Sequence, residues 1–104
     1  MGSNRIVPFG YNHPAVGMYE FTEYSIEQTF NDVSAVYIFT DIEHNPLYIG
    51  ETDELGTRIR NHEKLNCVNS LGCAFICIRQ EGKVNRESIE KKLINYYKPH
   101  CNDQ

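Results

Sequence analysis

Three side chains in the second half of the chain have types and spacing suited to phosphate chemistry: Arg58, His62 and Glu90. Arg58 and His62 are four residues apart, so a helix would place them on one face. The planar guanidinium of an arginine matches two phosphate oxygens. Glu90 lies between Ile89 and Leu93, at the edge of an apolar stripe, where a carboxylate is partly desolvated and needs a cation. A hard divalent metal ion bound through carboxylate oxygen and water would satisfy it.

Each of these residues also has a purely structural explanation. Arg86 precedes Glu90 by one helical turn and is placed to supply the cation as an ion pair. Arg58 and Arg60 fit the solvated face of a helix, and His62 fits the edge of a core with one hydrogen bond. Spacing alone leaves both interpretations open.

The elements that must position these residues follow from local pattern. Residues 34–40 (SAVYIFT) are typical of a strand, which turns through Asn45-Pro46 and returns over residues 47–49 as a hairpin. Asp53 is expected to cap a helix running to about residue 64, followed by a loop over residues 66–72. An apolar strand over residues 73–78 then precedes a helix, capped by Asn85, with residues 88–97 as its body. Its expected core stripe is Ile89, Leu93 and Tyr96. This order predicts an α+β fold with a small, mainly antiparallel sheet.

The first 33 residues are predicted to form an N-terminal extension that packs on the domain formed by residues 34–104. Prolines and glycines disfavour a helix before about residue 20. A short strand is expected over residues 18–24, and Ser25 with Gln28 resembles a capping box that opens a helix through about residue 31. The extension is also a candidate surface for a homodimer.

Four motifs in order carry a family resemblance. Ala35-Val36-Tyr37 is followed after ten residues by Tyr48-Ile49-Gly50, and Arg58 and His62 come eight and twelve residues after Gly50. The segment from Glu90 to Asn102 closes the pattern, with Leu93-Ile94 and Pro99-His-Cys-Asn102 inside it. Over residues 34–102 this arrangement resembles the GIY-YIG nuclease superfamily.

The resemblance implies a three-stranded antiparallel sheet flanked by helices. It also implies an endonuclease that hydrolyses phosphodiester bonds with one Mg²⁺ or Mn²⁺ ion, and the substrate expected first is DNA. It implies that Glu90 is the metal ligand, that Arg58 stabilises the phosphate, and that Tyr37 is a general base or positions the water. The implied catalytic set is Tyr37, Tyr48, Arg58, His62 and Glu90. Expected substrate contacts are Gly50, Arg60, Lys64, Lys91 and Asn102, where Asn102 anchors the C-terminal segment against the site.

The sequence departs from the family pattern at three points, of which the last two, together with the acidic first half of the chain, support an alternative. Ala35 and Val36 stand where the first motif has glycine and isoleucine, and Glu51 stands where some branches carry a lysine. The resemblance implies that DNA is usually recognised through an appended domain, and none is expected here, so basic side chains would have to supply the electrostatic footprint: Lys64, Lys83, Arg86, Lys91, Lys92 and Lys98. The alternative is a module that binds nucleic acid or a protein partner without cutting.

Charge and composition narrow the remaining choices. The 104 residues have a net charge of −4, yet residues 56–104 hold nine bases against five acids, which permits binding of a polyanion. With 40% hydrophobic residues the chain is not disordered. No run of about 20 apolar residues is present, and no secretory signal is visible, so a cytoplasmic location is expected. The four cysteines are expected to be free thiols rather than a zinc site: Cys67, Cys73, Cys77 and Cys101.

Overall fold

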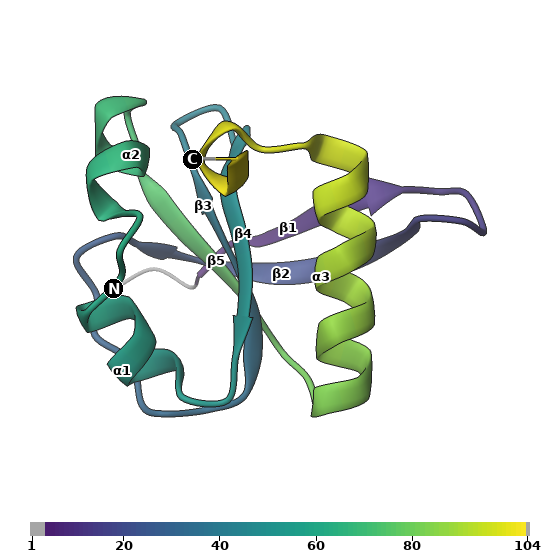
Figure 1. The fold of residues 1–104 in the computed structure, drawn as a ribbon, viewed down its shortest axis with the longest axis horizontal. Helices are drawn as coiled ribbons and strands as arrows, with labels where there is room; N and C mark the ends of the chain where they lie inside the picture. The colour runs from purple at the N-terminus through teal and green to yellow at the C-terminus, as the bar shows by residue number, and fades with distance from the viewer. Residues whose placement is uncertain (1–3, 104) are drawn as a thin grey trace.

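The computed structural model describes residues 4–103, which form five strands, three α-helices and a 3₁₀ helix (Figure 1). In chain order these are β1 (Ile6–Tyr11), β2 (Gly17–Ser25), β3 (Ala35–Thr40), β4 (Pro46–Thr52), α1 (Leu55–Arg60), α2 (Leu65–Ser70), β5 (Phe75–Gln80), α3 (Lys83–Tyr97) and η1 (His100–Asp103). The chain is therefore an α+β domain, as the order of predicted elements indicated.

The sheet has five strands in the order β1-β2-β5-β3-β4, and each neighbouring pair is antiparallel. The expectation of three strands was wrong, because β1 and β2 extend the sheet beyond β5. Val7 and Phe9 alternate with exposed neighbours along β1, which is typical of a half-buried strand. Pro8 and Gly10 hide this alternation in the sequence, but an edge strand tolerates a proline because one side of its backbone is unpaired.

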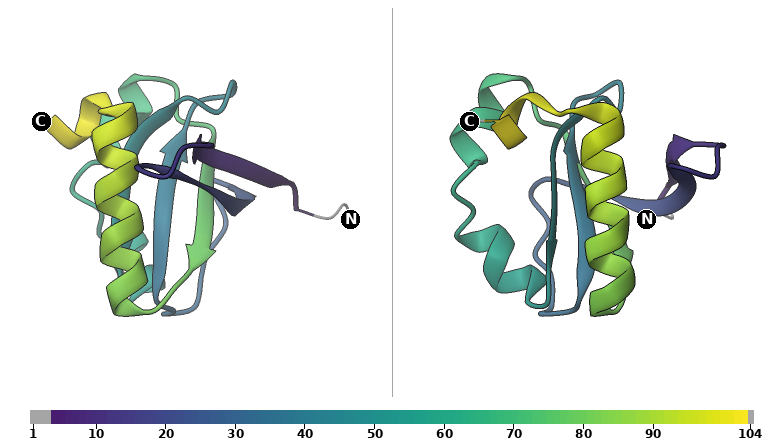
Figure 2. Two further views of the ribbon diagram at one scale, coloured as in Figure 1. Left: turned by 90° about the vertical axis from the view of Figure 1, so that its right-hand side faces the viewer. Right: turned by 45° about the vertical axis from the view of Figure 1, so that its right-hand side comes forward.

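Helices cover both faces of the sheet, so the molecule has three layers (Figure 2). On one face Ile89 and Leu93 of α3 pack in a core that includes Ile38 of β3 and Ile49 of β4. The other face packs against α1, α2 and η1 through a second core, which contains Tyr37. Strand β3 is buried on both sides, as its continuous apolar sequence indicates.

The helices that cover the Tyr37 face differ from the predicted ones. The helix expected over residues 53–64 ends at Arg60, and α2 forms where a loop was expected. Val68 is fully buried and Leu65 is partly buried, so tertiary packing stabilises a six-residue helix that its asparagines disfavour. The helix predicted from Ser25 is instead a turn, in which the Gln28 amide donates to the Ser25 carbonyl.

Helix α3 begins earlier than predicted, at Lys83, with Gly82 rather than Asn85 at its N-cap. It ends before Pro99, as expected. Tyr96 was placed in the core stripe, but it is 44% exposed. Its neighbour Tyr97 packs against the core instead. Both positions lie within a turn of Leu93, so the sequence spacing could not distinguish them.

Two of the four cysteines are joined. Cys67 of α2 and Cys101 of η1 form a disulfide across 34 residues, whereas Cys73 and Cys77 are free. The prediction of free thiols was wrong for Cys67 and Cys101, because only the tertiary fold brings α2 and η1 together. The expectation of a cytoplasmic location rested partly on the cysteines being free thiols. The disulfide removes that support for Cys67 and Cys101.

Candidate active site

The Tyr37 hydroxyl is the centre of a hydrogen-bonded cluster on the α1 and α2 face of the sheet. Its oxygen lies 2.7 Å from Nε2 of His62 and accepts a longer bond, 3.4 Å, from Nε of Arg58. Nδ1 of His62 accepts the Lys64 backbone N–H, so the proton of the neutral ring is on Nε2 and is donated to Tyr37. With His62 and Arg58 both donating to it, the Tyr37 oxygen leaves its own O–H to be donated elsewhere.

Tyr48 completes the cluster from β4. Its ring centroid lies 4.9 Å from that of His62 and 6.1 Å from that of Tyr37. Gly50 makes this packing possible, because a Cβ there would lie 2.5 Å from the Tyr37 hydroxyl oxygen and 2.9 Å from the Tyr48 ring. Gly50 is paired with Tyr37 across the β3–β4 ladder. The glycine of the second motif is therefore required by the two tyrosine rings that pass over it.

Burial controls protonation in this cluster. Burial and the positive charge of Arg58 together lower the pKa of His62 to about 4, so the imidazole is neutral at neutral pH. Burial also raises the pKa of Tyr37, although the hydrogen bond from Arg58 opposes that rise. A phenol in this position is held protonated, which makes it a weak general base and a good hydrogen-bond donor.

A polar contact from a distant segment fixes α1, the helix that carries Arg58. The Asp32 carboxylate accepts both the Thr57 backbone N–H (2.7 Å) and the Thr57 hydroxyl (2.9 Å). These bonds lower the pKa of Asp32. A Cβ at Gly56 would lie 2.2 Å from the Phe30 carbonyl oxygen, so the loop before β3 packs tightly on the start of α1. No local sequence pattern reveals this brace, since Asp32 and Thr57 are 25 residues apart.

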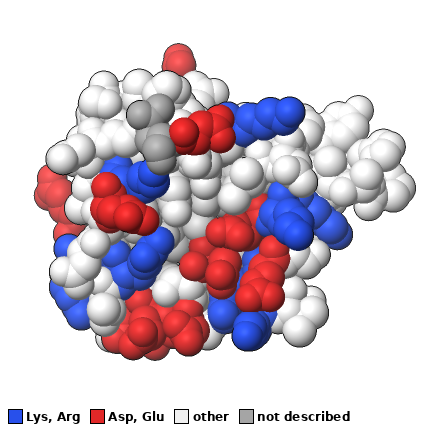
Figure 3. Space-filling view, in the orientation of Figure 1, with Lys and Arg blue, Asp and Glu red and all other residues white. Residues whose placement is uncertain are grey.

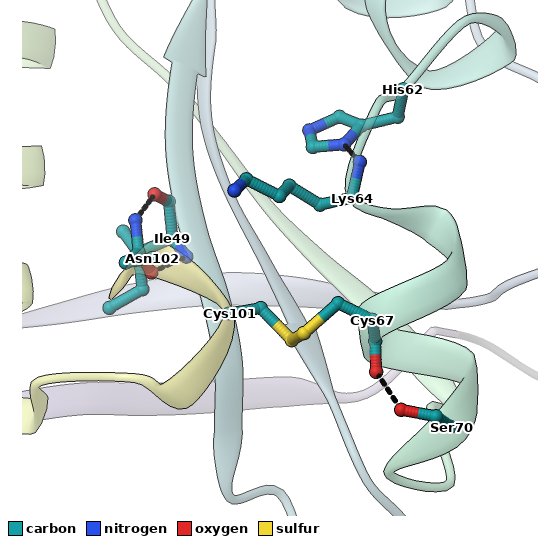
Figure 4. The surroundings of a disulfide bond; sticks show 7 residues. All are labelled: Ile49, His62, Lys64, Cys67, Ser70, Cys101 and Asn102. Atoms are coloured by element: carbon teal, nitrogen blue, oxygen red, sulfur yellow. Dashed lines mark hydrogen bonds between the residues drawn. A yellow bond between two sulfur atoms is a disulfide. The ribbon is translucent and has the colours of Figure 1, made fainter. Parts of the chain in front are cut away.

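The C-terminal segment is held to the same region by two contacts (Figure 4). The disulfide joins η1 to α2, which begins directly after His62 and Lys64. The Asn102 side chain accepts the Ile49 N–H and donates to the Ile49 carbonyl, each at 2.9 Å. Asn102 thus anchors η1 on β4, one residue from Tyr48. Figure 4 shows the Lys64 side chain extending from the start of α2 toward β4.

Glu90 belongs to a separate cluster on α3. Arg86, expected to pair with Glu90, instead donates from Nε to Glu51 of β4 at 2.5 Å. Glu90 is left half-buried, and burial raises its pKa to about 7. The negative charges of Glu51 and Glu87 contribute to this rise in the pKa. Within residues 4–103, Glu90 is thus half-buried with acidic neighbours, and Arg86 pairs with Glu51 in its place.

The two clusters lie on opposite faces of the sheet and meet at edge strand β4. Tyr48 and Gly50 point toward α1 and α2, whereas Ile49 packs with the α3 core and Glu51 contacts Arg86. Figure 3 shows acidic side chains gathered over the boundary of β4 and α3, with basic side chains over α1. The structure thus gathers Tyr37, Tyr48, Arg58 and His62 in one cluster, and places Glu90 beside it across β4.

The remaining predicted substrate contacts lie around these clusters. Arg60 is exposed on α1 and donates to the Thr57 hydroxyl at 3.2 Å, while Lys91 is exposed on α3. Arg86 was included in the electrostatic footprint, but it is 7% exposed and paired with Glu51, so it does not present its charge to a ligand. That pairing was missed in the sequence because its partner lies 35 residues away.

Few potential metal ligands surround Glu90. Within residues 4–103, no group of three or more histidine, cysteine, aspartate or glutamate side chains could hold one. Mg²⁺ does not require such a group, since one or two carboxylates with water and substrate phosphate complete its coordination. A half-buried carboxylate with acidic neighbours fits this mode, so Glu90 is a suitable ligand.

Comparison with known families decides the assignment. The family model of the GIY-YIG catalytic domain matches residues 33–102. The chain belongs to the GIY-YIG family. Strands β1 and β2 precede the matched residues, so the GIY-YIG domain of this chain carries an additional hairpin on its sheet. Searches of curated proteins and of solved structures gave no match. The family is of a nuclease type that acts on nucleic acid. Within residues 4–103 no helix has the length and apolar character needed to cross a membrane.

Proposed function

We propose that this GIY-YIG protein is a metal-dependent endonuclease that hydrolyses phosphodiester bonds in DNA. The observation that carries the proposal is the hydrogen-bonded Tyr37–His62–Arg58 cluster, which lies across β4 from a half-buried carboxylate with acidic neighbours. A phosphodiester strand placed along β4 would have a guanidinium on one side and a metal-binding carboxylate on the other.

The residues of this chain have distinct parts in that reaction. Arg58, partly exposed beside Tyr37, binds non-bridging phosphate oxygens and offsets the charge that develops in the transition state. Tyr37 stays protonated, and its O–H, which Tyr48 also approaches, donates to the phosphate or to the attacking water. His62 is neutral and holds the Tyr37 ring in place. This geometry favours the positioning role for Tyr37 over the general-base role, since burial raises its pKa.

Glu90 would hold a Mg²⁺ or Mn²⁺ ion. Such an ion, when bound, neutralises charge at the phosphate and lowers the pKa of coordinated water. Glu51 favoured the alternative of a non-cutting module because it would bring a negative charge near the phosphate. The ion pair of Glu51 with Arg86 offsets that charge. The binding module therefore loses one of the observations that favoured it.

The test compares Glu90→Gln with Glu87→Gln, a control that removes an exposed carboxylate one turn earlier on α3. Nicking and cleavage are measured on single-stranded, duplex and branched DNA and on RNA, with Mg²⁺, with Mn²⁺ and with a chelator. We expect Glu90→Gln to lose activity by about 100-fold or more, since it removes the metal ligand, and Glu87→Gln to retain it. Equal cleavage by wild type and Glu90→Gln, or no cleavage of any substrate by the wild type, would sink the proposal.

A further inference from the structure

The tip of the β1–β2 hairpin carries an exposed aromatic group that the catalytic cluster does not use. Tyr11 is 53% exposed and lies against Tyr96 of α3, with ring centroids 5.9 Å apart and planes 21° apart. The exposed His13 ring is stacked on Tyr11 in the same way, at 6.1 Å and 24°. Tyr11 is therefore nearly parallel to both of its ring neighbours at the surface. Exposed apolar patches of this kind often mark interaction sites.

Contacts below the rings hold this arrangement in place. The Gly10 backbone N–H donates to the Tyr97 hydroxyl at 2.7 Å, and Phe9 packs edge-to-face on the Tyr97 ring. Together these fix the hairpin to the C-terminal end of α3, so that Tyr11 meets Tyr96. Figure 2 shows the hairpin projecting past α3, away from the sheet. The aromatic group is thus presented on a fixed support.

The charges around the tip complement a polyanion. Residues 11–18 contain no lysine, arginine, aspartate or glutamate, and Figure 3 shows this uncharged projection bordered by basic side chains. Lys92 lies one turn before Tyr96 on the same face of α3. It lines a hollow of about 280 Å³ between the hairpin and α3, together with Tyr19 and Arg79. Arg79 is already paired with Glu81, whereas Lys92 forms no ion pair within residues 4–103.

We propose that Tyr11, His13 and Tyr96 form a stacking platform for unpaired bases of a nucleic-acid strand, with Lys92 binding the adjacent phosphate. Aromatic rings bind bases of any sequence by stacking, and a neighbouring cation tracks the backbone. Tyr96 is six residues beyond Glu90 on α3, about 9 Å along the helix axis. A single strand a few nucleotides long spans that distance. The inference rests on the proposed function and deepens it, because it selects substrates with unpaired or flared strands.

The absence of tryptophan from the sequence allows a direct probe. Tyr11→Trp places one indole in the platform, and Val84→Trp places one at an 81% exposed position at the other end of α3 as a matched control. Both are titrated, in chelator, with oligodeoxythymidylate of about twelve nucleotides and with a duplex of the same length. We expect the single strand to quench the emission of Tyr11→Trp and to leave that of Val84→Trp unchanged.

Affinity measurements complete the test. Tyr11→Ala and Tyr96→Ala should each weaken binding of the oligodeoxythymidylate roughly five- to 150-fold, the range expected for removing one stacking ring. Tyr96→Phe keeps the ring and should bind as the wild type does. Equal affinity for the wild type and both alanine variants would overturn the proposal. It would also be overturned if the same variants dissociated a homodimer without changing oligonucleotide affinity, because the hairpin would then be a protein interface.

The two proposals fail in different ways. If oligonucleotide binding depends on Tyr11 and Tyr96 but the protein cleaves no substrate, the nuclease proposal is contradicted and the stacking platform is supported. If the protein cleaves single-stranded and branched DNA and Tyr11→Ala does not change that cleavage, the stacking platform is contradicted and the nuclease proposal is supported.

Discussion

The two faces of the sheet meet at β4 but are built in different ways. On the α1 and α2 face, Tyr37, His62 and Arg58 form a compact cluster in which the histidine is neutral and each hydrogen bond has a defined donor. On the α3 face, Glu51 is balanced by Arg86 while Glu90 is left half-buried among negative charges. The hydrogen bonds of the first face join residues of the chain to one another, whereas on the second face we have proposed that Glu90 binds a metal ion. The difference locates the expected metal dependence in α3.

The largest expected effect concerns the covalent link on the Tyr37 face. Cys67→Ser should lower the free energy of unfolding by about 3–4 kcal/mol, because the open chain gains the entropy of a loop of roughly 35 residues. Urea unfolding measures the change. Hydrogen exchange should show faster opening of α2 and η1 than of α3, since the disulfide joins only the former two.

A reducing agent provides the control. It should destabilise the wild type by the same amount and have no further effect on Cys67→Ser. If reduction leaves the free energy of unfolding of the wild type unchanged, the disulfide does not stabilise the Tyr37 face. The two faces would then not differ through a covalent link.

The next effect concerns packing inside the tyrosine cluster. Gly50→Ala should cost about 1–3 kcal/mol and abolish cleavage, because its methyl group would overlap the buried Tyr37 hydroxyl and displace it from His62. Gly82→Ala, where no atom lies within 4 Å of the added methyl, is the control and should retain activity. Thermal unfolding and cleavage assays on both variants measure the effects. A fully active Gly50→Ala would show that the reaction does not depend on the close approach of the two rings.

The smallest expected effect concerns Glu90 on the α3 face. It changes how the free energy of unfolding depends on pH. The folded protein raises the pKa of Glu90 to about 7, above the value of about 4.3 expected in the unfolded chain. The folded state therefore binds the proton more tightly, and this group lowers stability progressively as pH rises from about 4.3 to 7. Because Glu90 is half-exposed, solvent screening reduces the effect to about 1 kcal/mol.

Glu90→Gln should therefore be about 1 kcal/mol more stable than the wild type at pH 8 and equally stable at pH 4. Mg²⁺ should stabilise the wild type at pH 8 and leave Glu90→Gln unchanged, which thermal unfolding can measure without any cleavage assay. A wild type that is equally stable with and without Mg²⁺ would contradict the assignment of the metal to Glu90.

Sequence reasoning predicted what depends on motif and local pattern. The two tyrosine motifs, the Arg58 and His62 spacing and the segment from Glu90 to Asn102 together predicted the family. The elements β3, β4, β5 and α3 follow from apolar runs with turn residues between them. The aromatic cluster was also predictable, because two strands joined by a short connection bring Tyr37 and Tyr48 onto one face.

What could not be predicted depends on contacts between distant residues. Strand β1 lacks a local signal because Pro8 and Gly10 interrupt it, and its position on the sheet depends on pairing with β2. Helical spacing made Arg86 one candidate cation for Glu90, yet in the fold Arg86 pairs with Glu51 of β4. The Cys67–Cys101 disulfide likewise depends on α2, a helix formed by the burial of Val68 rather than by propensity.

The contact between Asn102 and Ile49 has a consequence for the behaviour of the protein in concentrated solution. Strand β4 ends the sheet on its side, and an unpaired strand at that place is a template onto which another chain can add. The Asn102 amide occupies the Ile49 N–H and carbonyl as a neighbouring strand would. A single side chain thereby protects the β4 edge from strand addition, and Asn102→Ala should make the protein more prone to aggregate through that edge.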